Sequence, residues 1–312
     1  MRIRAARRDE LPAVYDLLDQ AFAEAPRSLF VAQTEHDSTF RLRHARVAVT
    51  DGRIAGYVRI FARTMLIRGV PVAAGGIGSV ATHPGARHDG IATALLQDAI
   101  EQMQRETMAV SFLFTGIPGF YERLGYRIVR EPYFEADASE AAATPTNSLY
   151  SLRSIEDADV RRLVAIHRTA TARTTGATLR SARTWRDAQH WLTEDDAGCF
   201  VAERNGVPVA YIRSRCREYG HQILEAECVP RHEGAIATLV AAVGRRALTH
   251  NERIVALAPD THPLATAFRT LPSTTETADV RFPMLMRSLS SDPAIDDAIS
   301  HDEIRLWNSD RI

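Results

Sequence analysis

The sequence contains no lysine, so its 38 basic residues are all arginines, and 39 acidic residues bring the formal net charge to −1. This balance excludes a basic protein that coats nucleic acid. Long apolar runs are also missing: none approaches the roughly 18 residues of a membrane-spanning helix. The chain starts with arginines and an acidic amphipathic stretch, without the apolar core of a secretory signal. We therefore expect a cytoplasmic protein with neither nucleic-acid nor membrane partners. The missing lysine is typical of a GC-rich bacterial genome, because lysine codons are rich in A.

Cysteine is scarce as well. Cys199, Cys216 and Cys228 are odd in number, widely spaced and confined to the second half of the chain. They form neither a disulfide framework nor a C-x-x-C metal site. An H-E-x-x-H motif is also absent, so the sequence predicts no metal.

Alternating strand and helix patterns run through residues 2–134 and then begin again after residue 147. Between them, residues 135–147 are small, polar and acidic, which is typical of a domain boundary. The segment ARHDGIATALL (86–96) also resembles PRHEGAIATLV (230–240). The fold class expected is therefore α/β, two copies of one unit with a mixed sheet. The domains are predicted at 1–135 and 148–288. They are followed by an acidic tail, 289–312, which is either solvated or docked as a short helix through Ile295, Ile299 and Leu306.

The predicted elements of the first copy place one loop between a strand and a helix. Strands are expected at 2–7, 46–50, 54–67, 72–82, 109–115 and 126–134, and helices at 10–22, 90–107 and 120–124. The loop at 83–89 thus leads into the amino end of a helix, whose unpaired N–H groups favour an anion. Gly90 and Ala92 are small enough to let phosphate oxygens approach the backbone, and Thr93 adds a hydroxyl. An ordinary polar loop with a helix cap explains the same pattern.

This arrangement resembles motif A of the GCN5-related N-acetyltransferases (GNAT superfamily). The family pattern Q/R-x-x-G-x-G/A corresponds here to Arg87-His88-Asp89-Gly90-Ile91-Ala92. The resemblance implies two tandem GNAT-like acyl-CoA N-acyltransferase folds with acetyl-coenzyme A as cosubstrate. It places the pyrophosphate at this loop and helix start. It also implies that the backbone of Val80, Ala81 and Thr82 binds the pantetheine arm and the acetyl carbonyl, and that Thr115 and Gly116 border the cofactor.

A second match, Phe120-Tyr121-Glu122-Arg123-Leu124-Gly125-Tyr126, looks like the family's F-Y-x-x-x-G-F/Y segment. It implies that Tyr121 is the general acid that protonates the leaving thiolate. The alternative is an aromatic residue that only packs against Tyr126 and the sheet. No general base is evident, because residues 72–82 contain no carboxylate. Glu35, His36 and Asp37 are candidates, although an exposed surface explains them too.

The second copy matches the first less well in the loop and helix start that would bind the anion. The loop before Gly234 is shorter than the loop at 83–89, and Ile236 stands where the first copy has the small residue Ala92. We therefore expect a degenerate domain. A tandem with the working copy first resembles the enhanced-intracellular-survival type of acetyltransferase. Those proteins have a further sterol-carrier-like domain, whose carboxyl terminus reaches the active site; here residues 289–312 follow instead, and whether the Ile312 carboxylate takes that role is open.

The function expected from these features is acetyl transfer from acetyl-coenzyme A to a primary amine of a small molecule or peptide, directly within a ternary complex. The alternatives are an acyl-coenzyme A sensor or partner-binding protein without catalytic activity, and an acyltransferase with a longer donor. The acceptor and the oligomeric state are left undetermined.

Overall fold

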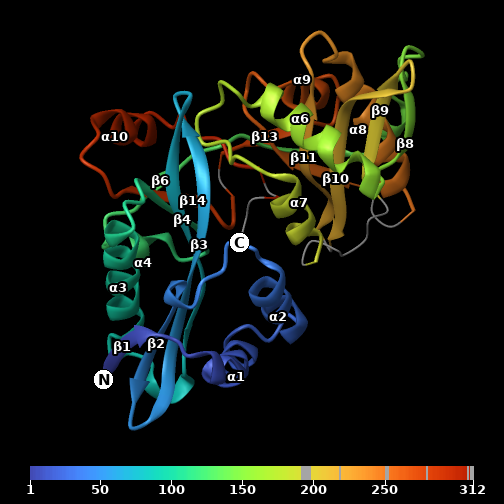
Figure 1. Cartoon of the computed structure of the whole chain (residues 1–312). Helices are drawn as coiled ribbons and strands as arrows, with labels where there is room; N and C mark the ends of the chain where they lie inside the picture. Colours follow the sequence, from blue (N-terminus) through green and yellow to red (C-terminus); the bar gives the residue numbers. More distant parts are fainter. Residues whose placement is uncertain (191–197, 218, 250–252, 279, 308, 310–312) are drawn as a thin grey trace.

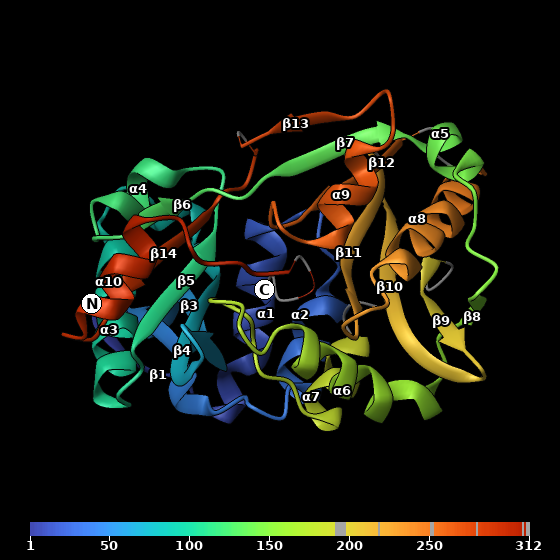
Figure 2. The same ribbon diagram turned by 90° about the horizontal axis from the view of Figure 1, so that it is seen from above.

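The computed structural model describes residues 1–190, 198–217, 219–249, 253–278, 280–307 and 309. Two mixed seven-stranded sheets stand side by side, one in each half of the molecule, with helices packed against them (Figures 1 and 2). The mixed α/β class expected from the sequence is confirmed, and two tandem folds account for it.

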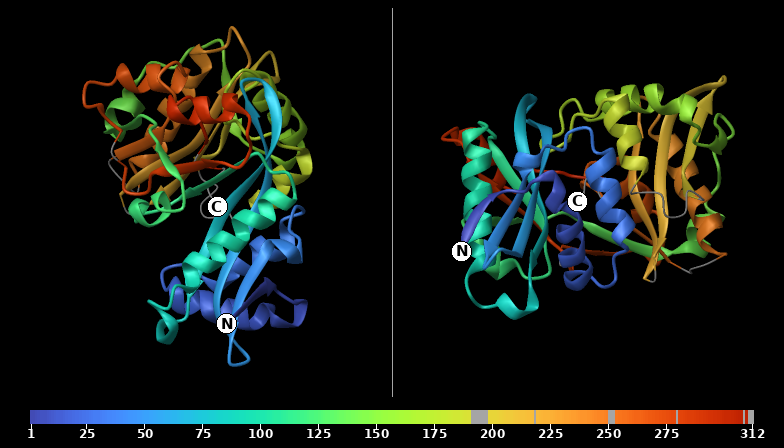
Figure 3. Two further views of the ribbon diagram at one scale, coloured as in Figure 1. Left: turned by 90° about the vertical axis from the view of Figure 1, so that its left-hand side faces the viewer. Right: turned by 60° about the horizontal axis from the view of Figure 1, so that its bottom comes forward.

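The first sheet has the order β1-β2-β3-β4-β5-β14-β6, with β4 and β5 as its parallel pair among the described strands. Helix α3 covers one face, and α1 and α2 cover the face turned toward the second domain (Figures 1 and 3). The elements of this half are β1 (Arg2–Ala5), α1 (Leu11–Ala21), α2 (Arg27–His36), β2 (Ala45–Thr50), β3 (Arg53–Ile67), β4 (Val70–Thr82), α3 (Ile91–Arg105), β5 (Val110–Phe114), α4 (Pro118–Glu122), β6 (Arg127–Val129) and β14 (Met284–Ser288).

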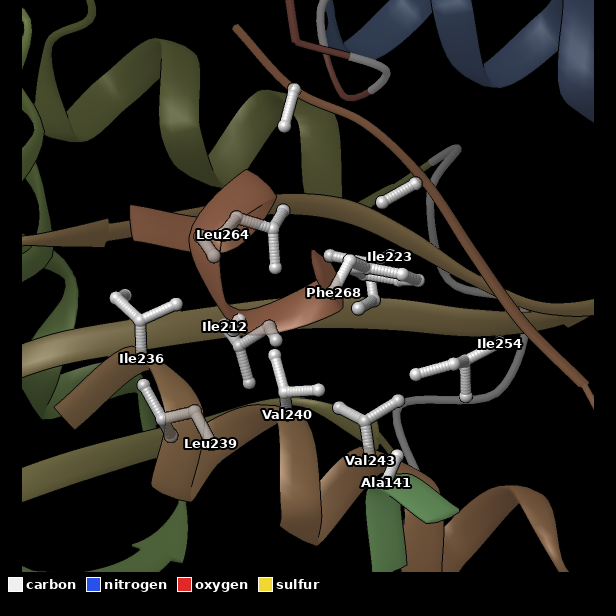
Figure 4. Packing of buried hydrophobic residues seen from close by; sticks show 14 of the residues in the cluster. Ala141, Ile212, Ile223, Ile236, Leu239, Val240, Val243, Ile254, Leu264 and Phe268 are labelled. Atoms are coloured by element: carbon white, nitrogen blue, oxygen red, sulfur yellow. The ribbon is translucent and has the colours of Figure 1, made fainter. Parts of the chain in front are cut away.

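The second sheet has the order β13-β7-β12-β11-β10-β9-β8, and here β11 and β12 are parallel. Its main core is largely aliphatic and lies between the sheet and helices α8 and α9 (Figure 4). The elements are β7 (Tyr133–Asp137), α5 (Ala138–Ala143), β8 (Ser151–Ser154), α6 (Val160–Ala170), α7 (Ala182–Gln189), β9 (Phe200–Arg204), β10 (Val207–Arg217), β11 (Gly220–Cys228), α8 (Gly234–Ala247), β12 (Arg253–Leu257), α9 (Pro263–Arg269) and β13 (Thr275–Thr277).

The two sheets exchange a strand across the predicted domain boundary. Residues 126–134, expected as one strand of the first domain, form β6 in the first sheet and the start of β7 in the second, and Pro132 lies between them. In return β14, at the end of the second copy, pairs with β5 and β6. Neither predicted segment therefore builds its sheet alone.

The acidic tail is docked. Helix α10 (Pro293–Ser300) buries Ile295 and Ile299 against the first domain, and Leu306 belongs to the same apolar cluster. Beyond α10 the chain runs back between the two domains (Figure 2). The docked alternative is the one that the structure adopts.

A further junction joins the halves along the part of β3 beyond Arg59, where β2 no longer pairs with it. Residues 176–179 of the second domain pair with β3, where the Leu66 N–H donates to the Ala177 carbonyl at 2.9 Å and the Leu179 N–H to the Thr64 carbonyl at 2.8 Å. These backbone bonds fix the second domain beside the middle of the first sheet.

Candidate active site

The parallel strands β4 and β5 separate after a short paired stretch. They pair only from Ala74–Val110 to Gly76–Phe112, and within the described residues β4 then has no strand partner on that side. Its pairing with β3 contains a bulge, because Ser79 and Val80 lie opposite a single residue, and Ser79 has a φ of +52°. Backbone polar groups that a sheet would normally pair are therefore open toward a gap between the strands.

The loop after β4 leads into α3, as predicted. Gly90 caps the helix with a φ of +74°, a conformation that glycine adopts without strain. Arg87, His88 and Asp89 are exposed, whereas Ile91 is buried in the core. Ala92 and Thr93 are half-buried in the first turn, and the helix start has no carboxylate within its first turn. Its free N–H groups and partial positive charge suit an anion such as a phosphate.

Tyr121 lies in α4 beside the gap. It belongs to the same apolar cluster as Val80 and Ile91, so the end of β4, the start of α3 and this ring border one core. The ring packs edge-on against Phe120 and Tyr126, and burial raises the pKa of Tyr121 to about 12. Within the described part of the chain its hydroxyl makes no hydrogen bond. The structure thus contains the aromatic packing, and it also leaves the hydroxyl available as a proton donor.

The remaining predicted residues lie at the ends of the two strands. Ala81 is buried under α1, and Thr82 pairs with Gly56. Thr115 is buried, and its hydroxyl accepts the Ile117 N–H at 3.1 Å. Gly116 is exposed after the end of β5. These two residues are not part of the Tyr121 cluster.

A cavity of about 270 Å³ lies on the opposite face of the sheet, between the two domains. Arg59, Phe61 and Arg63 alternate along β3 with residues that pack under α3, so their side chains face this side. Arg59 is 2% exposed and pairs with buried Asp37 at 2.9 Å. Arg63 shares Asp37 at 3.5 Å and reaches the cavity. The two guanidinium groups outweigh the cost of burial and keep the pKa of Asp37 below its usual range.

The second domain supplies the other wall. Glu225 of β11 is fully buried and accepts hydrogen bonds from Arg180 at 2.5 Å and Arg213 at 3.3 Å. These two cations overcome the desolvation of Glu225 and lower its pKa to about 2. Trp185 of α7 lies beneath both guanidinium groups, at 5.6 and 5.0 Å from its ring centre. Ser309 also lines the cavity and hydrogen-bonds Glu225.

Sequence reasoning missed this inter-domain cavity. Glu35 and His36 are exposed, as expected for ordinary surface residues, whereas Asp37 is buried. The signal lay in Arg59 and Arg63, two charges on one face of a strand that is otherwise apolar. Ile312 lies outside the described residues.

The described residues contain no group of three His, Cys, Asp or Glu side chains arranged to hold a metal ion. In the same part of the chain, no helix combines the length and the apolar character that crossing a membrane requires.

Comparison with known proteins bears on the first domain and on the fold. Residues 2–129 match the model of the acetyltransferase (GNAT) domain family. No curated protein matches the chain by sequence. The fold is similar to a GCN5-related N-acetyltransferase from Anabaena variabilis, with a TM-score of 0.72, 16% identity, and coverage of 93% of this chain and 73% of that one.

Two further solved structures share the fold. Eis1 from Mycobacterium abscessus has a TM-score of 0.65 and 17% identity, covering 94% of this chain and 75% of its own. The N-myristoyltransferase of Saccharomyces cerevisiae, solved with bound myristoyl-CoA, has a TM-score of 0.59 and 10% identity, covering 92% and 78%. Residues 2–129 are therefore similar to GNAT acetyltransferase domains, and the fold of the chain as a whole is similar to the folds of these solved structures.

Proposed function

We propose that the first domain transfers an acetyl group from acetyl-coenzyme A to a primary amine of a small molecule or peptide, directly and within a ternary complex. The observation that carries this proposal is the continuity of an open helix start, a bulged strand end and Tyr121 around one gap in the sheet. The phosphates would bind at residues 87–93, and the pantetheine arm would follow β4 into the gap.

The proposed reaction assigns a role to the end of β4 and to Tyr121. A neutral amine attacks the thioester carbonyl, a C–N bond forms, and the C–S bond breaks. A backbone N–H at Val80, Ala81 or Thr82 would stabilise the oxyanion that develops, an effect worth roughly 3–4 kcal/mol in other enzymes. Tyr121 would donate its proton to the departing thiolate, and the amine would lose its proton to water. The acetylated amine and the free thiol then leave.

Two measurements test this proposal. Calorimetry should show acetyl-coenzyme A binding at one site per chain, and a panel of amines should release free thiol. Tyr121→Phe should lower kcat about 100-fold, the usual size of a general-acid contribution. Tyr126→Phe is the matched control, because the buried Tyr126 hydroxyl bonds Ser111 at 2.7 Å inside the sheet. Absence of acetyl-coenzyme A binding would overturn the proposal, and equal rates for the wild type and Tyr121→Phe would remove Tyr121 as the acid.

The pH dependence adds a second readout. Because burial raises the pKa of Tyr121 to about 12, its hydroxyl stays protonated across the working range. Activity should therefore rise with pH as the acceptor amine loses its proton, and should show no alkaline loss below the pKa of Tyr121. A fall in kcat that begins near the ordinary tyrosine pKa of about 10 would contradict the raised pKa of the buried Tyr121 hydroxyl.

A binding protein that senses acyl-coenzyme A without turning it over is the second candidate. It is favoured by the lack of a carboxylate on β4 and by the lowered pKa of Asp37, which makes Asp37 a poor proton acceptor. Donor binding without turnover of any amine would support it. Competition between acetyl- and longer acyl-coenzyme A thioesters tests the donor length.

A further inference from the structure

We infer that the acceptor carries a carboxylate close to its amine, and that Arg63 and Arg213, which line one cavity from the two domains, recognise that carboxylate. This inference rests on the proposed function and names the class of acceptor: amino acids or other amino carboxylates. It comes from the charges and the unused donors of the cavity between β3 and α7.

Arg63 offers donors that the protein itself does not use. Its Nη1 donates to the Thr39 hydroxyl at 3.0 Å and the Ala62 carbonyl at 2.9 Å, and lies 3.5 Å from Asp37. Among the described residues, Nε and Nη2 have no partner, and neither atom is sealed in the protein interior. Since Nη1 fixes the group while the other donors are open, Arg63 is oriented but not saturated.

Arg213 is held in the same way from the second domain. Only its Nη1 contacts Glu225, at 3.3 Å, while the guanidinium lies 5.0 Å from the Trp185 ring centre. An aromatic ring fixes the plane of an arginine without occupying its N–H donors. Its other donors also have no partner within the described residues and are not sealed off. A carboxylate is the group that a planar, five-donor guanidinium binds best.

The charges of the cavity favour an anion over a polycation. The described lining residues include three arginines, at 63, 180 and 213, and two aspartates, Asp37 and Asp187. Asp37 is shared with a further arginine, Arg59, and Glu225 lies behind Arg180 and Arg213. Among the described residues, these neighbours included, four positive charges face three negative ones. An acceptor carboxylate would compensate the excess, whereas a molecule with several ammonium groups would meet repulsion.

The position of the cavity matches an acceptor site. Ala62, Arg63 and Thr64 pair with Gly75, Ala74 and Ala73 of β4, directly before the point where β4 leaves β5. The helix start for the donor phosphates lies on the face covered by α3, and the cavity lies on the other face. A carboxylate held at Arg63 and Arg213 would therefore leave the attached amine free to reach through the gap toward the thioester.

Matched pairs of ligands test the inference. Each pair joins an amino acid with the amine that its decarboxylation leaves: phenylalanine with phenethylamine, lysine with cadaverine, and 4-aminobutyrate with propylamine. Binding is measured by calorimetry with and without saturating coenzyme A, and kcat/KM is measured with acetyl-coenzyme A. In the wild type at least one carboxylate-bearing member should bind about tenfold or more tighter than its partner. Arg63→Gln and Arg213→Gln should each remove most of that preference.

The controls separate charge recognition from folding. Arg269→Gln removes an arginine that is likewise in ion pairs, with Asp260 and Glu276, but does not line the cavity, so it should leave the preference unchanged. Thermal melting checks that both cavity variants fold, and Arg63→Lys should keep part of the preference, because it keeps the charge. Equal or weaker binding of every amino acid relative to its amine, or a full preference in both Gln variants, overturns the inference. Loss of acetyl-coenzyme A binding alone would instead overturn the proposed function.

Discussion

The two domains use the same strand arrangement, yet only the first leaves it open. In each, a long strand pairs in parallel with its neighbour over three residue pairs, Ala74–Gly76 with β5 and His221–Ile223 with β12, and then continues past it. In the first domain the space beyond this pairing is bordered by bulged backbone and Tyr121. In the second it contains a side chain from the tail. Shared topology therefore provides a place for a ligand, and local residues decide whether one can enter.

The second gap is occupied by Trp307. Its indole N–H donates to buried Glu227 of β11 at 2.8 Å, and its ring packs edge-on against His262. His262 precedes α9, in the place where the first domain has the helix that carries Tyr121. The tail thus fills the groove that corresponds to the proposed cofactor groove of the first domain.

The two helix starts differ as well. At α8 the Glu233 carboxylate accepts the Arg231 N–H at 3.0 Å. Hydrogen bonds from the backbone N–H groups of Glu233 itself and Arg231 lower the pKa of Glu233. In the second domain this carboxylate therefore takes up backbone N–H groups, whereas Asp89, at the equivalent position before α3, makes no such bond among the described residues. The degenerate site expected from the shorter loop before Gly234 stays a prediction.

Removing the tail's tryptophan should have the largest effect. Trp307→Ala empties a buried site and leaves Glu227 without its indole donor, so we expect a loss of about 3–5 kcal/mol in the free energy of unfolding. Urea denaturation measures it. Trp307→Phe, which keeps most of the ring, should cost less.

The same variant tests what closes the second groove. Coenzyme A should still bind at one site per chain in Trp307→Ala, since Glu233 continues to occupy the start of α8. A second binding site in calorimetry would show that Trp307 alone excludes the ligand, and that Glu233 at the start of α8 does not prevent binding.

Adding a carboxylate to the first turn of α3 is the next largest change. Ala92→Glu brings a carboxylate into the first turn of α3, where it competes with the phosphates and repels them. We expect coenzyme A affinity to fall at least about 100-fold, which corresponds to roughly 2.7 kcal/mol. Ala92→Gln, of the same size but neutral, should retain much more affinity, and equal losses for both would point to steric blocking instead of charge.

The local features of the first domain were predictable because adjacent residues determine them. The loop at 83–89, the glycine cap and the helix after it are contiguous in sequence, and the apolar spacing of α3 is regular. Helix α2 was missed because it buries only Phe30 and Gln33, which gives no apolar stripe.

The strand exchange was not predictable from local pattern. Phe134 and Ala136 of β7 alternate with half-buried residues, whereas Met284, Leu285 and Met286 of β14 are all buried. Such patterns show which side chains are buried but do not tell which of two sheets provides the neighbours. The cavity was missed for a related reason: Arg63 and Arg213 are 150 residues apart, and only the apposition of the domains brings them to one space.

The smallest expected effect compares the arginines of the two sequence repeats, Arg87 and Arg231. Both are exposed and precede a helix glycine by three residues, but at α8 the neighbouring Glu233 already accepts backbone N–H groups, which Asp89 does not do within the described residues. Arg87→Gln should weaken coenzyme A binding about tenfold, close to 1.4 kcal/mol, because one charge-assisted contact to a phosphate is lost. Arg231→Gln should leave the affinity unchanged, since the neighbouring Glu233 already neutralises the start of α8. Calorimetry at two salt concentrations separates the cases: the Arg87 effect should shrink as salt screens the phosphate contact. Equal losses in both variants would mean that the second domain also takes part in cofactor binding, and the contrast between an open and a filled domain would then be wrong.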